Sequence, residues 1–136
     1  MTTTTSASTT TAGPTTTTTT TIPGTTEGTL QYSTAASRAN SAPLSGSSLG
    51  RSSSVYVHYA TAITYSTVSF WIDNPNRTGG AFHVEINPPY DLNNGSVASA
   101  NAYSLSGLTP GTHSITVSAL RANGTSFVTT STFTVV

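Results

Sequence analysis

The chain contains no cysteine, no lysine and few charged residues of either sign among its 136 residues. Without cysteine it can form no disulfide framework, no thiolate-ligated zinc or iron–sulfur site and no cysteine nucleophile. Charged side chains make up 6% of the chain, and four scattered arginines cannot build a basic surface for nucleic acid. No apolar run reaches the roughly 18 residues of a membrane span. We therefore expect neither nucleic-acid binding nor a membrane span.

Catalytic motifs are also missing. His58, His83 and His113 lie far apart, without the H-x-H or H-E-x-x-H spacing of a metal site. The serines form no G-x-S-x-G elbow, and there is no glycine-rich phosphate loop. We interpret the histidines as ordinary strand residues, with His58 and His83 pointing outward by alternation. The sequence thus predicts no enzyme, no metal and no cofactor.

Residues 1–27 form a threonine-rich segment in which sixteen of the first 26 residues are Thr. So few apolar side chains cannot offset the entropy of ordering the backbone, so we expect an extended arm or linker. It lacks the basic and apolar regions of a signal peptide. Such an arm can be held by a neighbouring sheet, because β-branched Thr suits extended backbone, or by a glycan coat. Candidate O-glycosylation sites are Thr15, Thr16, Thr17, Thr18, Thr19 and Thr20.

Residues 28–136 alternate apolar and polar side chains with period two and show no helical periodicity. Turn signals separate the runs, and Asn123-Gly124 predicts a hairpin between the last two strands. Short strands separated by turns predict an all-β protein with a two-sheet antiparallel β-sandwich of the immunoglobulin-like kind. The expected inward residues are Leu30, Val55, Val57, Val68, Phe70, Ile72, Phe82, Val84, Leu105, Leu108, Ile115, Val117, Phe127 and Phe133.

Residues 105–119, LSGLTPGTHSITVSA, resemble the E–F corner of fibronectin type III and related immunoglobulin-like domains. His113 stands where those domains place a tyrosine, and the turn is one residue shorter, so a hydrogen-bonded corner is not expected. A wider set resembles the immunoglobulin-like modules of secreted prokaryotic surface proteins and polysaccharide-acting enzymes: Ser37-Arg38, residues 55–57, residues 68–73, Glu85, residues 89–91, residues 111–116 and residues 133–135. This resemblance implies an extracellular or cell-surface spacer, adhesion unit or wall-associated repeat.

Charged residues are so rare that an arginine and a carboxylate at equivalent heights are expected to pair. We predict a structural ion pair between Arg38 and either Glu85 or Asp91, which would fix the strand after the first loop. A calcium site at Asp91, Asn93 and Asn94 is not expected, because the D-x-D-x-D-G pattern is absent.

Trp71 lies between two inward residues and is therefore expected to face outward. By the same alternation, His83 and Glu85 on the next strand would share its face. An outward Trp can stack on a sugar, or it can be covered by a loop or by a neighbouring subunit. We favour the covered interpretation, because a single aromatic ring is a small platform. Trp71 and His83 are accordingly candidate contacts for a subunit or a sugar.

Three N-x-S/T sequons fall in predicted turns, and their asparagines are candidate N-glycosylation sites: Asn76, Asn94 and Asn123.

These sequence features together lead to two hypotheses about function. The first is a glycosylated structural subunit of an extracellular fibre, pilus-like filament or coat, whose arm packs on or inserts into a neighbouring copy. The alternative is a carbohydrate-binding or spacer module of a secreted polysaccharide-acting protein. The expected partners are copies of the chain itself and glycans.

Overall fold

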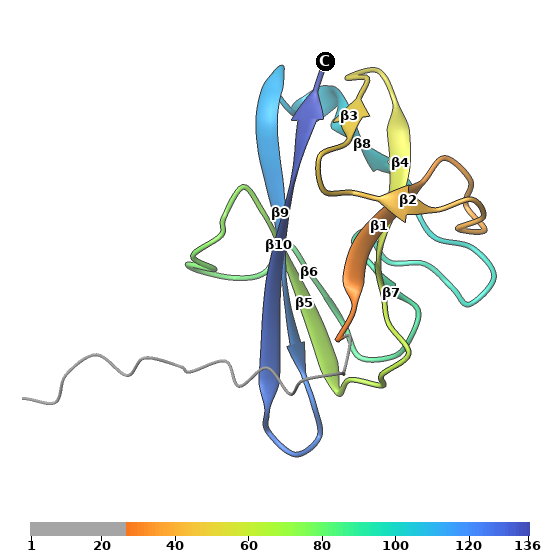
Figure 1. Cartoon of the computed structure of the whole chain (residues 1–136). Coiled ribbons are helices and arrows are strands. Elements are labelled where there is room, and N and C mark those ends of the chain that lie inside the picture. The colour runs from red at the N-terminus through yellow and green to blue at the C-terminus, as the bar shows by residue number, and fades with distance from the viewer. Residues whose placement is uncertain (1–26) are drawn as a thin grey trace, which may run out of the picture.

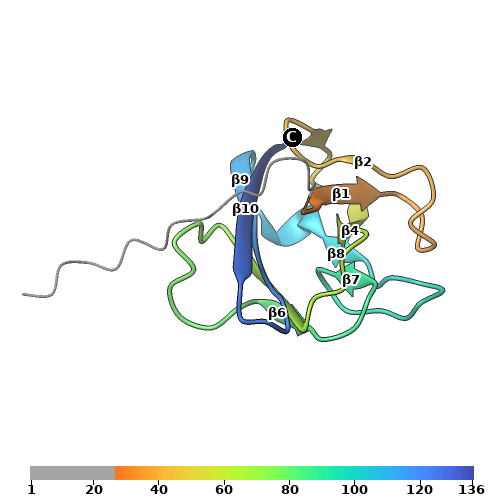
Figure 2. The ribbon, with the colours of Figure 1, turned by 60° about the horizontal axis from the view of Figure 1, so that its bottom comes forward.

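The computed structural model describes residues 27–136. Residues 1–26, which include the six threonines named above, lie outside this part. The described chain forms two facing five-stranded sheets (Figure 1), and viewed from one end they form two layers with β9 and β10 in one and β1 and β4 in the other (Figure 2). This confirms the prediction of an all-β, two-sheet sandwich.

One sheet, called sheet A here, has the order β2-β1-β4-β7, with β8 also paired to β4. The other, sheet B, has the order β3-β10-β9-β5-β6. The short 3-10 helix η1 (Leu105–Gly107) precedes β9. The strands are β1 (Thr29–Ser33), β2 (Ala42–Pro43), β3 (Ser48–Leu49), β4 (Ser54–Ala60), β5 (Thr67–Ile72), β6 (His83–Glu85), β7 (Tyr90–Asp91), β8 (Tyr103–Ser104), β9 (Gly111–Leu120) and β10 (Ser126–Val135).

The longest pairing joins β9 and β10 through the predicted Asn123-Gly124 turn, where Gly124 adopts a φ of 87° that glycine tolerates. The pairs are antiparallel with one exception. The two residues of β3 run parallel to Thr134 and Val135 at the end of β10. The hairpin lies at one end of the sandwich and the C-terminus at the other (Figure 1).

The core fills the space between the sheets. Most predicted inward residues are buried, and Ile72, Leu108 and Phe127 are partly buried against them. The prediction was wrong for Phe82 and Val84, which are 49% and 47% exposed. Alternation also missed core residues in loops and short strands: Leu44, Leu49, Tyr65, Tyr90 and Leu92.

Candidate assembly site

Of the two predicted carboxylate partners, the structure brings Asp91 to Arg38. Arg38 donates from Nε to Asp91 Oδ1 at 2.7 Å and from Nη2 to Asp91 Oδ2, and it also donates to the carbonyls of Ser96 and Val97. The Asp91 side chain is only 2% exposed. The hydrogen bond to Asp91 raises the pKa of Arg38. The guanidinium therefore ties the loop after β1 to β7 and to the loop that follows β7.

The loop after β1 also covers His58, which was expected to point into solvent. His58 lies opposite Asp91 in the β4–β7 pair and is 8% exposed, with Nε2 at 3.5 Å from Ser41 Oγ. Burial lowers the pKa of His58, which favours the neutral ring. The alternation gave the face correctly, but a loop packed over that face excludes the solvent.

Glu85 pairs within its own strand, where His83 Nε2 lies 3.0 Å from Glu85 Oε1. The register of β6 contradicts the expected face. His83 is opposite Phe70 and Glu85 is opposite Val68, so both lie on the inward side at the sandwich edge. Val84, opposite Ser69, lies on the face of Trp71 instead. A shift of one residue in this short edge strand exchanges its two faces, because side chains alternate with period two.

Trp71 lies on the outer face of sheet B, opposite Thr116 of β9. Thr116 is fully buried, and its hydroxyl is 2.8 Å from that of Thr130 on β10. Trp71 is itself half-buried, and its indole N–H has no hydrogen-bond partner among residues 27–136. The ring thus lies among hydroxyl side chains and is only partly accessible.

His113 makes the corner hydrogen bond that the sequence did not predict. Its Nε2 lies 2.7 Å from the carbonyl oxygen of Thr109, and its Nδ1 lies 2.6 Å from Asp73 Oδ2. Both neighbours accept hydrogen bonds, so the protonated ring satisfies both by donating twice. The hydrogen bond to Asp73 raises the pKa of His113. The His113 ring therefore links Thr109, just before β9, to Asp73 in the loop after β5.

Glu27, expected to belong to the arm, is bonded to the sandwich. Arg121 Nη2 donates to both Glu27 carboxylate oxygens, at 2.7 and 2.8 Å. The Tyr65 hydroxyl donates to Oε2 at 2.6 Å, and Thr61 Oγ1 donates to the Glu27 carbonyl at 2.6 Å. This cluster fixes the point at which the chain enters the sandwich. Sequence analysis missed it because Glu27 and Arg121 are 94 residues apart.

The most unusual feature is one edge of β10. All ten residues of β10 pair with β9, but β3 pairs with Thr134 and Val135 alone. Between residues 126 and 131, the edge of β10 that faces away from β9 therefore has no strand partner in the described part of the chain. This open edge contains no charged residue and no proline.

The other edges are short or interrupted by proline. β2 has two residues and ends at Pro43, and β3 and β7 have two residues each. The outer edge of β6 has three residues, and Pro88-Pro89 follows it closely. Proteins commonly block exposed edges in these ways to prevent pairing with other chains. The open edge of β10 lacks these protections.

The three sequon asparagines, Asn76, Asn94 and Asn123, are all exposed on turns.

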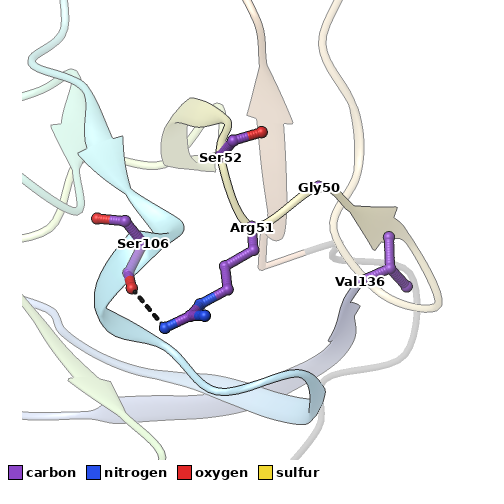
Figure 3. Close-up of a pocket in the computed structure, with 5 residues that line it drawn as sticks. All are labelled: Gly50, Arg51, Ser52, Ser106 and Val136. Carbon is purple, nitrogen blue, oxygen red and sulfur yellow. Dashed lines mark hydrogen bonds between the residues drawn. The ribbon is translucent and has the colours of Figure 1, made fainter.

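Within residues 27–136, no group of three or more His, Cys, Asp and Glu side chains could hold a metal ion. A shallow hollow beside the C-terminus is lined by Gly50, Arg51, Ser52, Ser106 and Val136 (Figure 3). The Arg51 guanidinium donates to the Ser106 carbonyl, as Figure 3 shows, and also to the Leu108 carbonyl. No helix in the described part is long and apolar enough to cross a membrane.

No family model matches the chain, and no curated protein matches it. Among solved structures it is similar to the fibronectin(III)-like modules of CbhA from Clostridium thermocellum, with 12% identity and a TM-score of 0.46. That match covers 69% of this chain and 89% of the other. The class that the structure defines is an all-β, two-sheet β-sandwich.

Proposed function

We propose that the chain is a structural subunit of an extracellular fibre or surface coat. In this assembly, the threonine-rich arm of one copy packs on or inserts into the sandwich of the next. The observation that carries the proposal is the open, uncharged edge of β10 in a chain whose first 26 residues are rich in β-branched threonine. Extended segments bind exposed sheet edges through main-chain hydrogen bonds.

The geometry of such a contact favours a filament. The arm and the edge are different surfaces, so a contact between them is head-to-tail and adds copies without closing unless the rotation forms a ring. Charged residues are rare, and only two of the four arginines, Arg51 and Arg77, are exposed. Close packing of copies therefore meets little charge repulsion. The exposed turns at Asn76, Asn94 and Asn123 leave room for glycans that would keep the fibre soluble.

Deletion of residues 1–26 tests the proposal. The full chain should form oligomers or fibres, measured by light scattering and electron microscopy, while the truncated chain should stay monomeric with an unchanged far-UV circular dichroism spectrum. Glu27 remains in the truncated chain, so its bonds to Arg121 and Tyr65 are kept. Fibres that form equally well without the arm would contradict the proposal, as would a full chain that stays monomeric.

The half-buried Trp71 on a hydroxyl-rich face favours a second candidate, a carbohydrate-binding or spacer module of a secreted polysaccharide-acting protein. Trp71→Ala should then abolish retention on an insoluble polysaccharide, and Trp71→Phe should keep part of it. Retention of both variants at the level of the original chain would reject a sugar site at this residue.

A further inference from the structure

We propose that residues 126–131 of β10 form the acceptor edge for residues 15–22 of a second copy, which add to sheet B as a strand. This inference rests on the proposed function and specifies the contact. It follows from the direction of the unpaired backbone groups, from the length of the donor and from the place where the chain enters the sandwich.

The backbone hydrogen bonds of β3 show which groups of β10 point to the open edge. The Thr132 carbonyl accepts from Gly46 N at 2.8 Å, and Thr134 N donates to the Ser47 carbonyl at 2.9 Å. Backbone groups of alternate residues in a strand point to the same edge. The N–H and C=O groups of Val128 and Thr130 therefore point to this edge, where residues 27–136 offer them no partner. An added strand would satisfy them.

The donor matches the acceptor in length and chemistry. Residues 15–22 are seven threonines and Ile22, bounded by Pro14 and Pro23. Eight residues extend about 26 Å and the six open residues about 20 Å, at roughly 3.3 Å per residue. Proline lacks the N–H that a ladder needs, so the two prolines limit the strand to this stretch. Neither partner carries a charge, so pairing buries no unpaired ion.

The entry point of the chain favours a second copy as the source. Glu27 is held by Arg121 at the end of β9 and by Tyr65 just before β5, whereas the open edge lies on the far side of β10. Only four residues, 23–26, join the donor to Glu27, and four extended residues span about 13 Å. They would have to reverse the direction of the chain within that length to place residues 15–22 along the edge of their own sandwich.

The absence of natural cysteine allows a direct test by disulfide cross-linking. One full-length chain carries Val128→Cys, and a second carries a single cysteine at position 16, 17, 18, 19, 20 or 21 in turn. Equimolar mixtures are oxidised, and the heterodimers are measured on non-reducing gels and mapped by mass spectrometry. We expect the strongest heterodimer at the donor position opposite Val128, weaker ones two residues to either side of it and none at the positions between, because alternate side chains of a paired strand share a face and a disulfide bridges only close positions. The matched control is Val84→Cys on β6, which should give none.

The outcomes separate the inference from the proposed function. Assembly with cross-links to Val84→Cys, or without the period of two, would overturn the inference and leave the fibre proposal standing. Cross-links that form only within chains carrying both cysteines would show that the arm docks on its own sandwich, and would also overturn it. A full chain that stays monomeric and gives no cross-link would reject both proposals.

A proline substitution gives a second, independent measurement. The N–H of Val128 points to the open edge, so Val128→Pro removes a group that β9 does not use. We expect this variant to lose assembly while its circular dichroism spectrum and cooperative unfolding remain, and Val128→Ala to assemble normally. A folded Val128→Pro chain that assembles like the original would contradict pairing at this edge.

Discussion

Two arginine–carboxylate pairs hold different parts of the sandwich. The Arg38 and Asp91 side chains are 11% and 2% exposed, while those of Arg121 and Glu27 are 26% and 14% exposed. The first pair fixes a loop over the outer face of sheet A, and the second fixes Glu27 at the start of the sandwich. In a chain with so few charges, the buried pair determines loop geometry and the more exposed pair holds the first residue that the structure describes. The predictions that follow test this difference.

Arg38→Ala should have the largest effect on stability. It leaves the buried Asp91 carboxylate without its partner, which typically lowers the free energy of unfolding by about 3–5 kcal/mol. Urea unfolding measures this change. Replacing both residues, by Arg38→Met with Asp91→Leu, should lower stability less than Arg38→Ala does, because no buried charge remains. An unchanged unfolding midpoint for Arg38→Ala would remove the structural role of the pair.

Arg121→Ala should lower the free energy of unfolding by about 1 kcal/mol, as expected for a partly exposed ion pair. Its effect should shrink in high salt, since screening acts more strongly on exposed charges than on buried ones. Measuring the free energies of unfolding of Arg38→Ala and Arg121→Ala at low and high salt therefore distinguishes the buried pair from the more exposed pair. The matched control is the exposed Arg77→Ala, which should stay within about 0.5 kcal/mol of the original chain. Equal salt dependence of the two pairs would contradict the comparison.

The third ionic contact, between His113 and Asp73, should give a pH dependence of opposite sign to that of His58. The pKa of His113 is raised in the folded state, so its stabilisation is complete below the unfolded value near 6.5 and is lost as the pH rises through the folded pKa. The pKa of the buried His58 is lowered, so its effect is a loss of stability as the pH falls below about 6.5.

Unfolding free energies between pH 5 and pH 9 measure these effects. His113→Asn should abolish the fall in stability above pH 6.5 and leave the acid limb, to which His58 contributes. Tyr103 lies near Asp73, but its pKa is raised by burial, so it stays neutral across this range. If stability still falls above pH 6.5 in His113→Asn, then a group other than His113 causes that fall.

The smallest effect is expected at β6. Val84→Thr should change the free energy of unfolding by less than about 0.5 kcal/mol, because Val84 is half exposed on the outer face. Val68→Thr, at a fully buried position in the neighbouring strand β5, should destabilise by at least about 1 kcal/mol by placing a hydroxyl in the core. Equal losses would show that Val84 points inward, as the sequence had indicated.

Strands with several alternating residues could be predicted well from the sequence. The β9–β10 hairpin and β5 each place one apolar face on the core, so a shift by one residue would expose the whole face. β6 has three residues and lies at an edge. Its pairing with Phe70 and Val68 set its register, which the local pattern of Phe82 and Val84 did not reveal.

Among the candidate contacts, the sequence left Glu85 and Asp91 open as partners of Arg38, because pairing depends on where loops return in space. It assigned Glu27 to the arm for the same reason. His113 was noted at the corner, but its bonds to Thr109 and Asp73 depend on the position of the loop after β5.

The sequence by itself determined the fold class, and it predicts a threonine-rich arm before the sandwich. Period-two alternation and threonine-rich composition are local properties, and they act through backbone preference and burial wherever the chain lies. Only the tertiary structure decided which edge stays open. That edge exists because β3 pairs with the last two residues of β10 and no farther. The extent of such a pairing depends on how far a loop reaches, which no local pattern of residues records.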